Sequence, residues 1–310
     1  MADFDRRAHP ADARFATWTA PDGWQCRRMD WPRAKGAPAL GSLLFAGGRG
    51  DFIEKYLEAY AHWQNHGWNV TAFDWRGQGA SRGEAPPGSP ESLDLLVGDL
   101  AALIEEWRRE GEGPHVAIGH SMGGHVLLRT LAERRPVLDA AVLVAPMIAI
   151  NSAPLPLWGA SWLASTLSMF GWRHHPAWHQ PAEPSPAGSF RQSILTGSAE
   201  RYEDEAYWWG REPGFNLGVP SWGWLDAAYR SSAALTADAL AKVDLPVLLI
   251  GTERDRLVSP AAIRRAAALL PRAELLMFDD SGHEILREAD EVRLAALARI
   301  DAFLAANAGT

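Results

Sequence analysis

A serine stands between two glycines in the stretch Gly119-His120-Ser121-Met122-Gly123, directly after an apolar run and directly before an amphipathic one. The pattern G-x-S-x-G is typical of a sharp strand-to-helix turn that exposes the serine hydroxyl. Glycine is needed at the flanking positions because side chains there would collide with neighbouring elements. The positive end of the following helix would stabilise a developing oxyanion. The sequence therefore predicts that Ser121 is a nucleophile.

A serine hydroxyl becomes an effective nucleophile only when a base removes its proton and an acid orients that base. His283 is the candidate base, because it lies in a short glycine-containing loop after the last predicted strand. Asp255 is the candidate acid, because it follows the preceding strand by four residues and functional loops leave the carboxyl ends of parallel strands. Glu253 is the rival acid, and Asp279 and Asp280 are weaker rivals.

Other histidines have a smaller claim to chemistry. His62 and His66 are four residues apart on a predicted helix and could share a metal ion, but no acidic partner lies in register. An exposed helix face is therefore expected there. Five more lie beside the serine or in an irregular later segment: His120, His125, His174, His175 and His179. The side chain of His120 is expected to point away from the serine, and His125 is expected to pack on its helix. Metal binding by the last three is not favoured. No metal and no organic cofactor is predicted.

Short apolar runs alternate with longer helical patterns along most of the chain. The runs that predict buried strands are 40–46, 68–75, 115–120, 140–146, 245–251 and 273–279. The predicted helices are 52–66, 91–110, 122–134, 260–270 and 287–306. This alternation is typical of an α/β protein with a mostly parallel sheet and helices on both faces. Two earlier segments, 13–18 and 24–31, are expected to form an antiparallel pair.

The alternation stops between about residues 147 and 240, where prolines and eight of the fifteen tryptophans gather. Three parts are therefore predicted: a first core part at 1–146, an inserted, mainly helical cap at 147–240, and a second core part at 241–310. The tryptophans could hold the cap together, line an acyl-chain groove, or do both, and indole faces in such a groove can also receive a quaternary ammonium group. The candidate substrate contacts are Trp158, Trp208, Trp222 and Trp224.

Bulk composition excludes several classes of protein. The formal net charge is −8 and the 30 Lys and Arg residues are scattered, so nucleic acid is not an expected partner. Cys26 is the single cysteine, so no internal disulfide forms, which fits a reducing compartment. The charged N-terminal residues do not fit a signal peptide, and the longest apolar run, 140–150, is too short to span a bilayer. A soluble, cytoplasmic protein is expected.

Several motifs together resemble the α/β-hydrolase superfamily, and within it the serine hydrolase branch that contains monoglyceride lipases and lysophospholipases. The segment 47–56 resembles the oxyanion loop of that family, and 73–83 is similar to its D-x-R-G-x-G-x-S loop. The serine turn and the segments around Asp255 and His283 complete the likeness, which covers about residues 15–146 and 243–306. The edges of the predicted cap also resemble those of bacterial lysophospholipases.

The resemblance implies an α/β-hydrolase fold and a triad of Ser121, His283 and Asp255. It further implies that the backbone N–H groups of Arg49 and Met122 form the oxyanion hole. One departure is that Gly47-Gly48 stands where many relatives have His-Gly. The loop would then be less tethered, and Arg49 could instead be a surface residue with its amide turned away.

Three functions are compatible with these residues. The first is a serine esterase for lipids with one acyl chain, of the lysophospholipase or monoacylglycerol lipase type. The second keeps the triad for short-chain esters or for a proline-type aminopeptidase, whose acids would come from residues 200–209. The third is a binding protein without catalysis. The expected partner is a small lipid or ester, with at most transient membrane contact. Asp74 and Arg76 are expected to tether their loop and to take no part in the chemistry.

Overall fold

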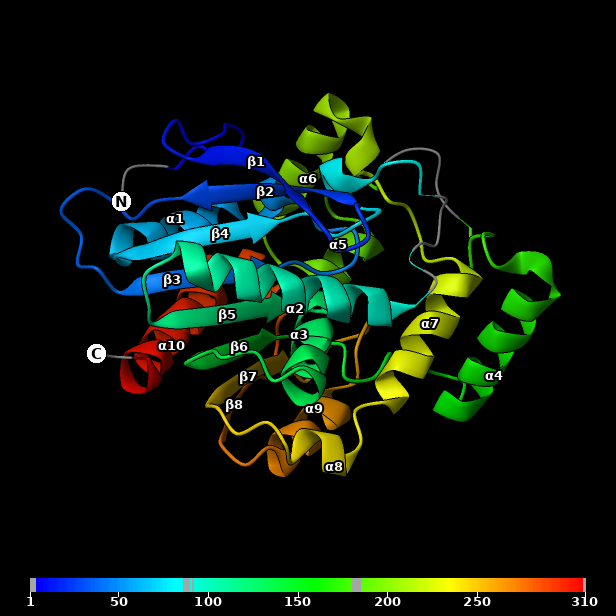
Figure 1. Cartoon of the computed structure of the whole chain (residues 1–310). Coiled ribbons are helices and arrows are strands. Elements are labelled where there is room, and N and C mark those ends of the chain that lie inside the picture. Colours follow the sequence, from blue (N-terminus) through cyan, green and yellow to red (C-terminus); the bar gives the residue numbers. More distant parts are fainter. Residues whose placement is uncertain (1–3, 86–89, 91, 180–184, 309–310) are drawn as a thin grey trace.

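The computed structural model describes residues 4–85, 90, 92–179 and 185–308 (Figure 1). Its strands join one sheet in the order β1-β2-β4-β3-β5-β6-β7-β8. They are β1 (Arg14–Thr19), β2 (Gln25–Trp31), β3 (Gly41–Ala46), β4 (Trp68–Phe73), β5 (His115–His120), β6 (Ala140–Val144), β7 (Val247–Thr252) and β8 (Ala273–Phe278). β1 and β2 are antiparallel, β2 pairs antiparallel with β4, and the other pairs are parallel. The prediction of a mostly parallel sheet with an antiparallel lead-in is confirmed.

Helices cover both faces of this sheet. Figure 1 shows α2 (Leu93–Glu110) and α3 (Met122–Glu133) in front of it, and α1 (Leu57–His66) and α10 (Asp290–Asn307) behind it. Buried side chains of α2, α3 and α9 (Pro260–Leu269) form one hydrophobic core with the sheet, and those of α1 and α10 form a second. Both faces of the central strands are buried, which explains their continuous apolar sequences.

Further helices lie between β6 and β7. They are α4 (Leu157–Leu167), α5 (Phe190–Leu195), α6 (Ala199–Arg211), α7 (Trp222–Ala233) and α8 (Ala237–Leu240). α4 and α7 pack side by side at the end of the sheet where β5 leads into α3 (Figure 1). The boundaries of a cap at 147–240 stay a prediction, and residues 180–184 of that segment lie outside the described residues.

The described residues also form five short helical segments of three to five residues. They are Ile53–Tyr56, Gly79–Ser81, Ser168–Trp172, Pro213–Phe215 and Ile285–Arg287. Among the described residues, no helix is both long enough and apolar enough to cross a membrane.

Candidate active site

Ser121 lies in a strained turn between β5 and α3. Its φ of 51° and ψ of −116° are unusual for a residue with a side chain. The turn is held by a hydrogen bond from the Ser121 amide to the carbonyl oxygen of Val144 at 2.9 Å. A Cβ on Gly119 would approach Gly124 Cα to 2.7 Å, and one on Gly123 would approach the Ala46 carbonyl oxygen to 2.2 Å. The two glycines of the motif are therefore required by close packing.

The structure brings the side chains of Ser121, His283 and Asp255 together. His283 Nε2 is 2.8 Å from Ser121 Oγ, and His283 Nδ1 is 2.7 Å from Asp255 Oδ2. The second carboxylate oxygen, Oδ1, accepts hydrogen bonds from the amides of Leu257 and Val258 at 2.8 and 2.9 Å. These amides fix the carboxylate, the carboxylate orients the imidazole, and the imidazole reaches the hydroxyl. Such a chain can remove a proton from the serine.

The charges of the acid and the base support each other. Burial alone would raise the pKa of Asp255, but the charge and hydrogen bond of His283, with the two amides, outweigh burial and lower it. Burial alone would lower the pKa of His283, but the charge and hydrogen bond of Asp255 raise it above its ordinary value. An imidazole with a raised pKa is a better proton acceptor from the serine hydroxyl.

The rival acids lie elsewhere. Glu253 is paired with Arg264, Asp280 is paired with Arg254 at 2.7 Å, and Asp279 is exposed. Of the two histidines beside the serine turn, His120 is within hydrogen-bond distance of other side chains through Nδ1, and His125 Nε2 contacts Ser231 Oγ at 2.6 Å.

The predicted oxyanion loop is tied down without a histidine. The Gly48 amide donates to Asp51 Oδ2 at 2.6 Å, and the indole N–H of Trp75 donates to the Gly47 carbonyl oxygen at 2.7 Å. A Cβ on Gly48 would lie 3.0 Å from Ser121 Cβ, so this loop passes directly beside the serine. The expectation of a weakly tethered loop is wrong, because Asp51 and Trp75 supply the missing tethers.

The side chain of Arg49 is half-buried and tied to the protein, so Arg49 is not a free surface residue. Its guanidinium donates to the carbonyl oxygens of Gly218 and Val219 at 2.8 and 3.0 Å, and it lies 5.2 Å from the ring centre of Trp224. Burial lowers its pKa to about 9. Among the described residues, no protein group accepts a hydrogen bond from the backbone N–H of Arg49 or of Met122. Both amides are therefore available to an added oxygen atom.

A buried cluster of charges, which the sequence did not reveal, supports the loop. Lys55 Nζ lies within ion-pair distance of three carboxylates: Asp51 at 2.9 Å, Glu205 at 2.8 Å and Glu284 at 2.6 Å. Asp51 holds the predicted oxyanion loop, Glu284 follows His283, and Glu205 belongs to α6. Burial alone would raise the pKa of Glu284, but the charges of Lys55 and Arg287 outweigh burial and lower it to about 2. One ammonium group thus joins three separate parts of the site.

We expect Lys55→Met to destabilise the fold by about 3–5 kcal/mol, because it leaves buried carboxylates without their cation. Urea unfolding at pH 7 measures this loss of free energy. Lys242→Met is the matched control, since Lys242 is exposed and should change the free energy of unfolding by only about 0.5 kcal/mol or less. Equal stability of the two variants would contradict the role given to the cluster.

Asp74 and Arg76 hold the loop after β4. Asp74 accepts from the amides of Ile53 and Ala80 at 2.9 and 2.8 Å, and Arg76 binds Asp99 at 2.5 Å. Burial raises the pKa of Asp74 to about 6. These bonds are structural tethers of the kind expected from the sequence.

The four candidate tryptophans have different surroundings. Trp158 on α4 is 77% exposed, whereas Trp222 is half-buried against the core. Trp224 is buried with the Arg49 guanidinium over its ring, so that ring face is already occupied by a cation. Trp208 is buried, stacks on His9 and donates to the Arg6 carbonyl oxygen at 3.2 Å. The structure therefore gives Trp208 a packing function against the N-terminal segment.

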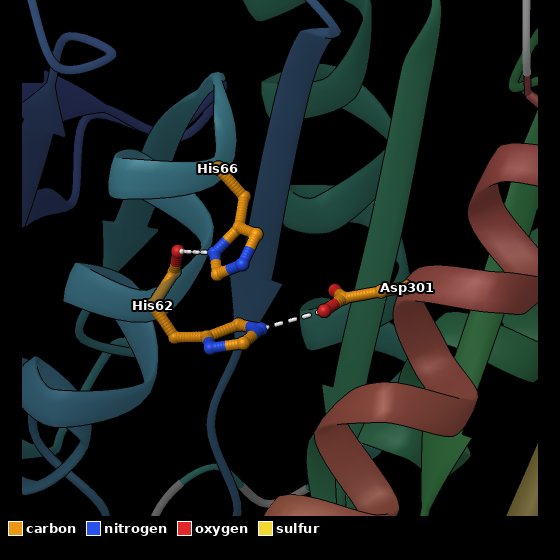
Figure 2. Close-up of side chains that lie close together, drawn as sticks. All are labelled: His62, His66 and Asp301. Atoms are coloured by element: carbon orange, nitrogen blue, oxygen red, sulfur yellow. Dashed lines mark hydrogen bonds and ion pairs between the residues drawn. The ribbon is translucent and has the colours of Figure 1, made fainter. Parts of the chain in front are cut away.

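The expectation that His62 and His66 have no acidic partner is wrong. Asp301 from α10 lies 2.7 Å from His62 Nε2, and the three side chains form one group (Figure 2). The sequence could not show this contact, because the partner is 239 residues away along the chain. In the described part of the chain, this is the one group with a geometry that could hold a metal ion.

The sheet order, the crossover helices and the serine turn define an α/β-hydrolase. The chain belongs to the Hydrolase_4 family, described as serine aminopeptidase, S33, whose model matches residues 37–290.

Several known proteins are similar to the chain over most of its length. Lysophospholipase L2 of Escherichia coli K12 is 29% identical over 82% of this chain and 77% of its own. A probable lysophospholipase L2 of Haemophilus influenzae is 24% identical over 84% of this chain and 83% of its own. A soluble variant of monoglyceride lipase from Saccharomyces cerevisiae shares the fold, with a TM-score of 0.74 and 17% identity. The match covers 99% of this chain and 100% of the lipase chain. The predicted superfamily and the predicted class, a serine ester hydrolase, are confirmed.

Proposed function

We propose that Ser121, His283 and Asp255 form a catalytic triad that hydrolyses carboxylic esters of lipids with one acyl chain. The substrate would be of the lysophospholipase or monoacylglycerol lipase type. The observation that carries the proposal is the continuous hydrogen-bonded chain from Asp255 through His283 to Ser121. Full-length relatives described as lysophospholipases support the choice of substrate.

The mechanism follows from the order of the groups. Ser121 Oγ attacks the ester carbonyl carbon while its proton passes to His283 Nε2, and the ionised Asp255 stabilises the imidazolium. The carbonyl electron pair collects on oxygen, where the amides of Arg49 and Met122 would donate to it. The intermediate collapses when His283 gives the proton to the leaving alcohol. A water molecule, deprotonated by His283, then attacks the acyl carbon. The bond from that carbon to Ser121 Oγ breaks, Oγ takes the proton back from His283, and the fatty acid leaves.

An exposed apolar surface supports a lipid substrate. On α4 and the turn that follows it, five large apolar side chains are each more than half exposed: Trp158, Trp162, Met169, Phe170 and Trp172. Single exposed apolar residues are ordinary on proteins, whereas several on two consecutive elements indicate contact with apolar material. Transient contact with lipid aggregates or a membrane surface would suit this group.

A proline-type aminopeptidase is the second candidate, because the family description names a serine aminopeptidase. Such an enzyme needs a free acid near the site to bind the substrate's ammonium group. In the segment 200–209, Asp204 is already paired with Arg6 and Arg7, and Glu205 with Lys55 and Arg191. Glu200 also contacts Arg6, at 3.2 Å. Three of the four acids in this segment are therefore paired within the protein, which favours the esterase, and the exposed Glu203 is the one left for an ammonium group.

A panel of substrates tests the proposal. Purified protein is assayed with lysophosphatidylcholine, monoacylglycerol, p-nitrophenyl butyrate and prolyl-naphthylamide. We expect release of fatty acid from at least one of the two lipids, with kcat/KM above that for the butyrate ester and no cleavage of the prolyl amide. Fast cleavage of the amide without fatty acid release would overturn the lipid assignment in favour of the aminopeptidase.

A further inference from the structure

Two helices on one face of the sheet present a group of metal-binding side chains. His62 and His66 belong to the last two turns of α1, and Asp301 belongs to α10 (Figure 2). One ligand atom from each residue lies within 4.8 Å of the other two. From these residues we infer a site for a divalent transition-metal ion, with Zn²⁺ as the best match.

The hydrogen bonds of His66 prepare it as a ligand. Its Nδ1 is 2.6 Å from the carbonyl oxygen of His62, and a carbonyl accepts hydrogen bonds, so Nδ1 carries the proton. The lone pair of the neutral ring is then on Nε2, which faces His62 and Asp301 in Figure 2. A backbone carbonyl that fixes the tautomer of a histidine in this way is a recurring feature of metal sites.

Asp301 has spare capacity to bind. Its Oδ2 contacts His62 Nε2 at 2.7 Å, whereas its Oδ1 is buried and has no hydrogen-bond partner among the described residues. A buried carboxylate oxygen without a partner is costly, and a bound cation would satisfy it. The site also lies at the C-terminal end of α1, where the helix dipole favours positive charge.

The donor set selects the kind of ion. Two imidazoles four residues apart and one carboxylate suit Zn²⁺, Ni²⁺ or Cu²⁺, whereas Mg²⁺ and Ca²⁺ prefer oxygen ligands. Zn²⁺ bonds of about 2.0–2.2 Å place tetrahedral ligands about 3.3–3.5 Å apart. The three ligand atoms, which lie within 4.8 Å of one another, therefore move closer together when the ion binds. On binding, the metal ion replaces the hydrogen bond between His62 Nε2 and Asp301. The proton of that hydrogen bond moves to His62 Nδ1 or to solvent. Water completes the coordination.

The position of the site argues for stabilisation of the fold. Only Gly67 separates His66 from β4, so the site lies near the amino ends of the parallel strands, whereas Ser121 follows the carboxyl end of β5. A metal ion there would join α1 to α10, two helices that share one hydrophobic core. The simple alternative is that His62 and Asp301 form an ordinary ion pair and His66 only caps its helix.

Zinc titration of the full chain, without an affinity tag and stripped with a chelator, separates these two cases. By calorimetry we expect one saturable Zn²⁺ per chain, and zinc at 100 times its Kd should raise Tm by roughly 5 °C. His66→Ala leaves the contact between His62 and Asp301 in place, yet should weaken zinc binding about tenfold or more. Asp301→Asn should weaken it similarly.

His179→Ala is the matched control, because it removes an exposed histidine outside the group and should leave zinc binding unchanged. Melting without zinc checks that each variant folds. The proposal is overturned if the parent shows no saturable binding, or if His66→Ala binds zinc as tightly as the parent. Ser121→Ala should bind zinc like the parent, so this test is independent of the hydrolase assignment.

Discussion

Ser121→Ala should lower kcat for ester hydrolysis by about 10⁶-fold, the loss typical of removing the nucleophile from a serine triad. The hydroxyl oxygen forms the covalent bond to the acyl group, and no neighbouring group replaces it. The remaining activity would come from the oxyanion amides and substrate binding. Steady-state assays on the best substrate of the panel, at matched protein concentration, measure this loss.

The control for this prediction is Ser193→Ala, which removes an exposed serine hydroxyl on α5 and should leave kcat unchanged. Circular dichroism and thermal melting should show that both variants keep the fold. If Ser121→Ala retained more than about 1% of the parent kcat, a difference of four orders of magnitude from expectation, Ser121 would not be the nucleophile.

The second large effect is expected for Asp255→Asn, with a loss in kcat of about 10⁴-fold. The carboxylate accepts a hydrogen bond from the Nδ1–H group of His283 and would stabilise the imidazolium. An amide in its place can donate to Nδ1 and hold the ring in the wrong tautomer. The positions of the three side chains would be nearly unchanged, but His283 Nε2 would carry a proton and could not take the one from Ser121.

The pH dependence gives this variant a separate signature. Activity requires neutral His283, so kcat/KM falls as the pH drops through the pKa of this residue. Asp255 raises that pKa, so the acid limb of the parent should lie above the ordinary imidazole value of about 6.5. In Asp255→Asn the limb should move to lower pH. The exposed rival acid offers the control, Glu253→Gln, which should keep both the rate and the limb. A fall in rate for Glu253→Gln instead would show that the acid was wrongly assigned.

Much of the fold was predictable because its signals are local. The central strands are buried on both faces, so each reads as an apolar run such as 115–120. The serine turn was predictable because the pattern G-x-S-x-G lies within five consecutive residues, although the contact that requires Gly123 is with Ala46, far away along the chain. His283 and Asp255 could be chosen because parallel strands bring their carboxyl ends to one edge.

The contacts that could not be predicted join residues far apart along the chain. Nothing near Lys55 in the sequence indicates that it meets Glu205 and Glu284, and burial of a lysine is uncommon without such partners. Likewise, Asp301 reaches His62 only because α1 and α10 pack on the same face. Periodicity identifies the buried face of each helix, but it does not determine which residues of two helices face each other.

Mass spectrometry of the protein treated with a fluorophosphonate tests the central claim most directly. These reagents phosphonylate a serine that is activated by a neighbouring base. The account predicts one adduct per chain, on the peptide that contains Ser121, with loss of activity in proportion to labelling and no adduct in Ser121→Ala. A stoichiometric adduct on any other serine, or full activity in protein labelled at Ser121, would contradict it.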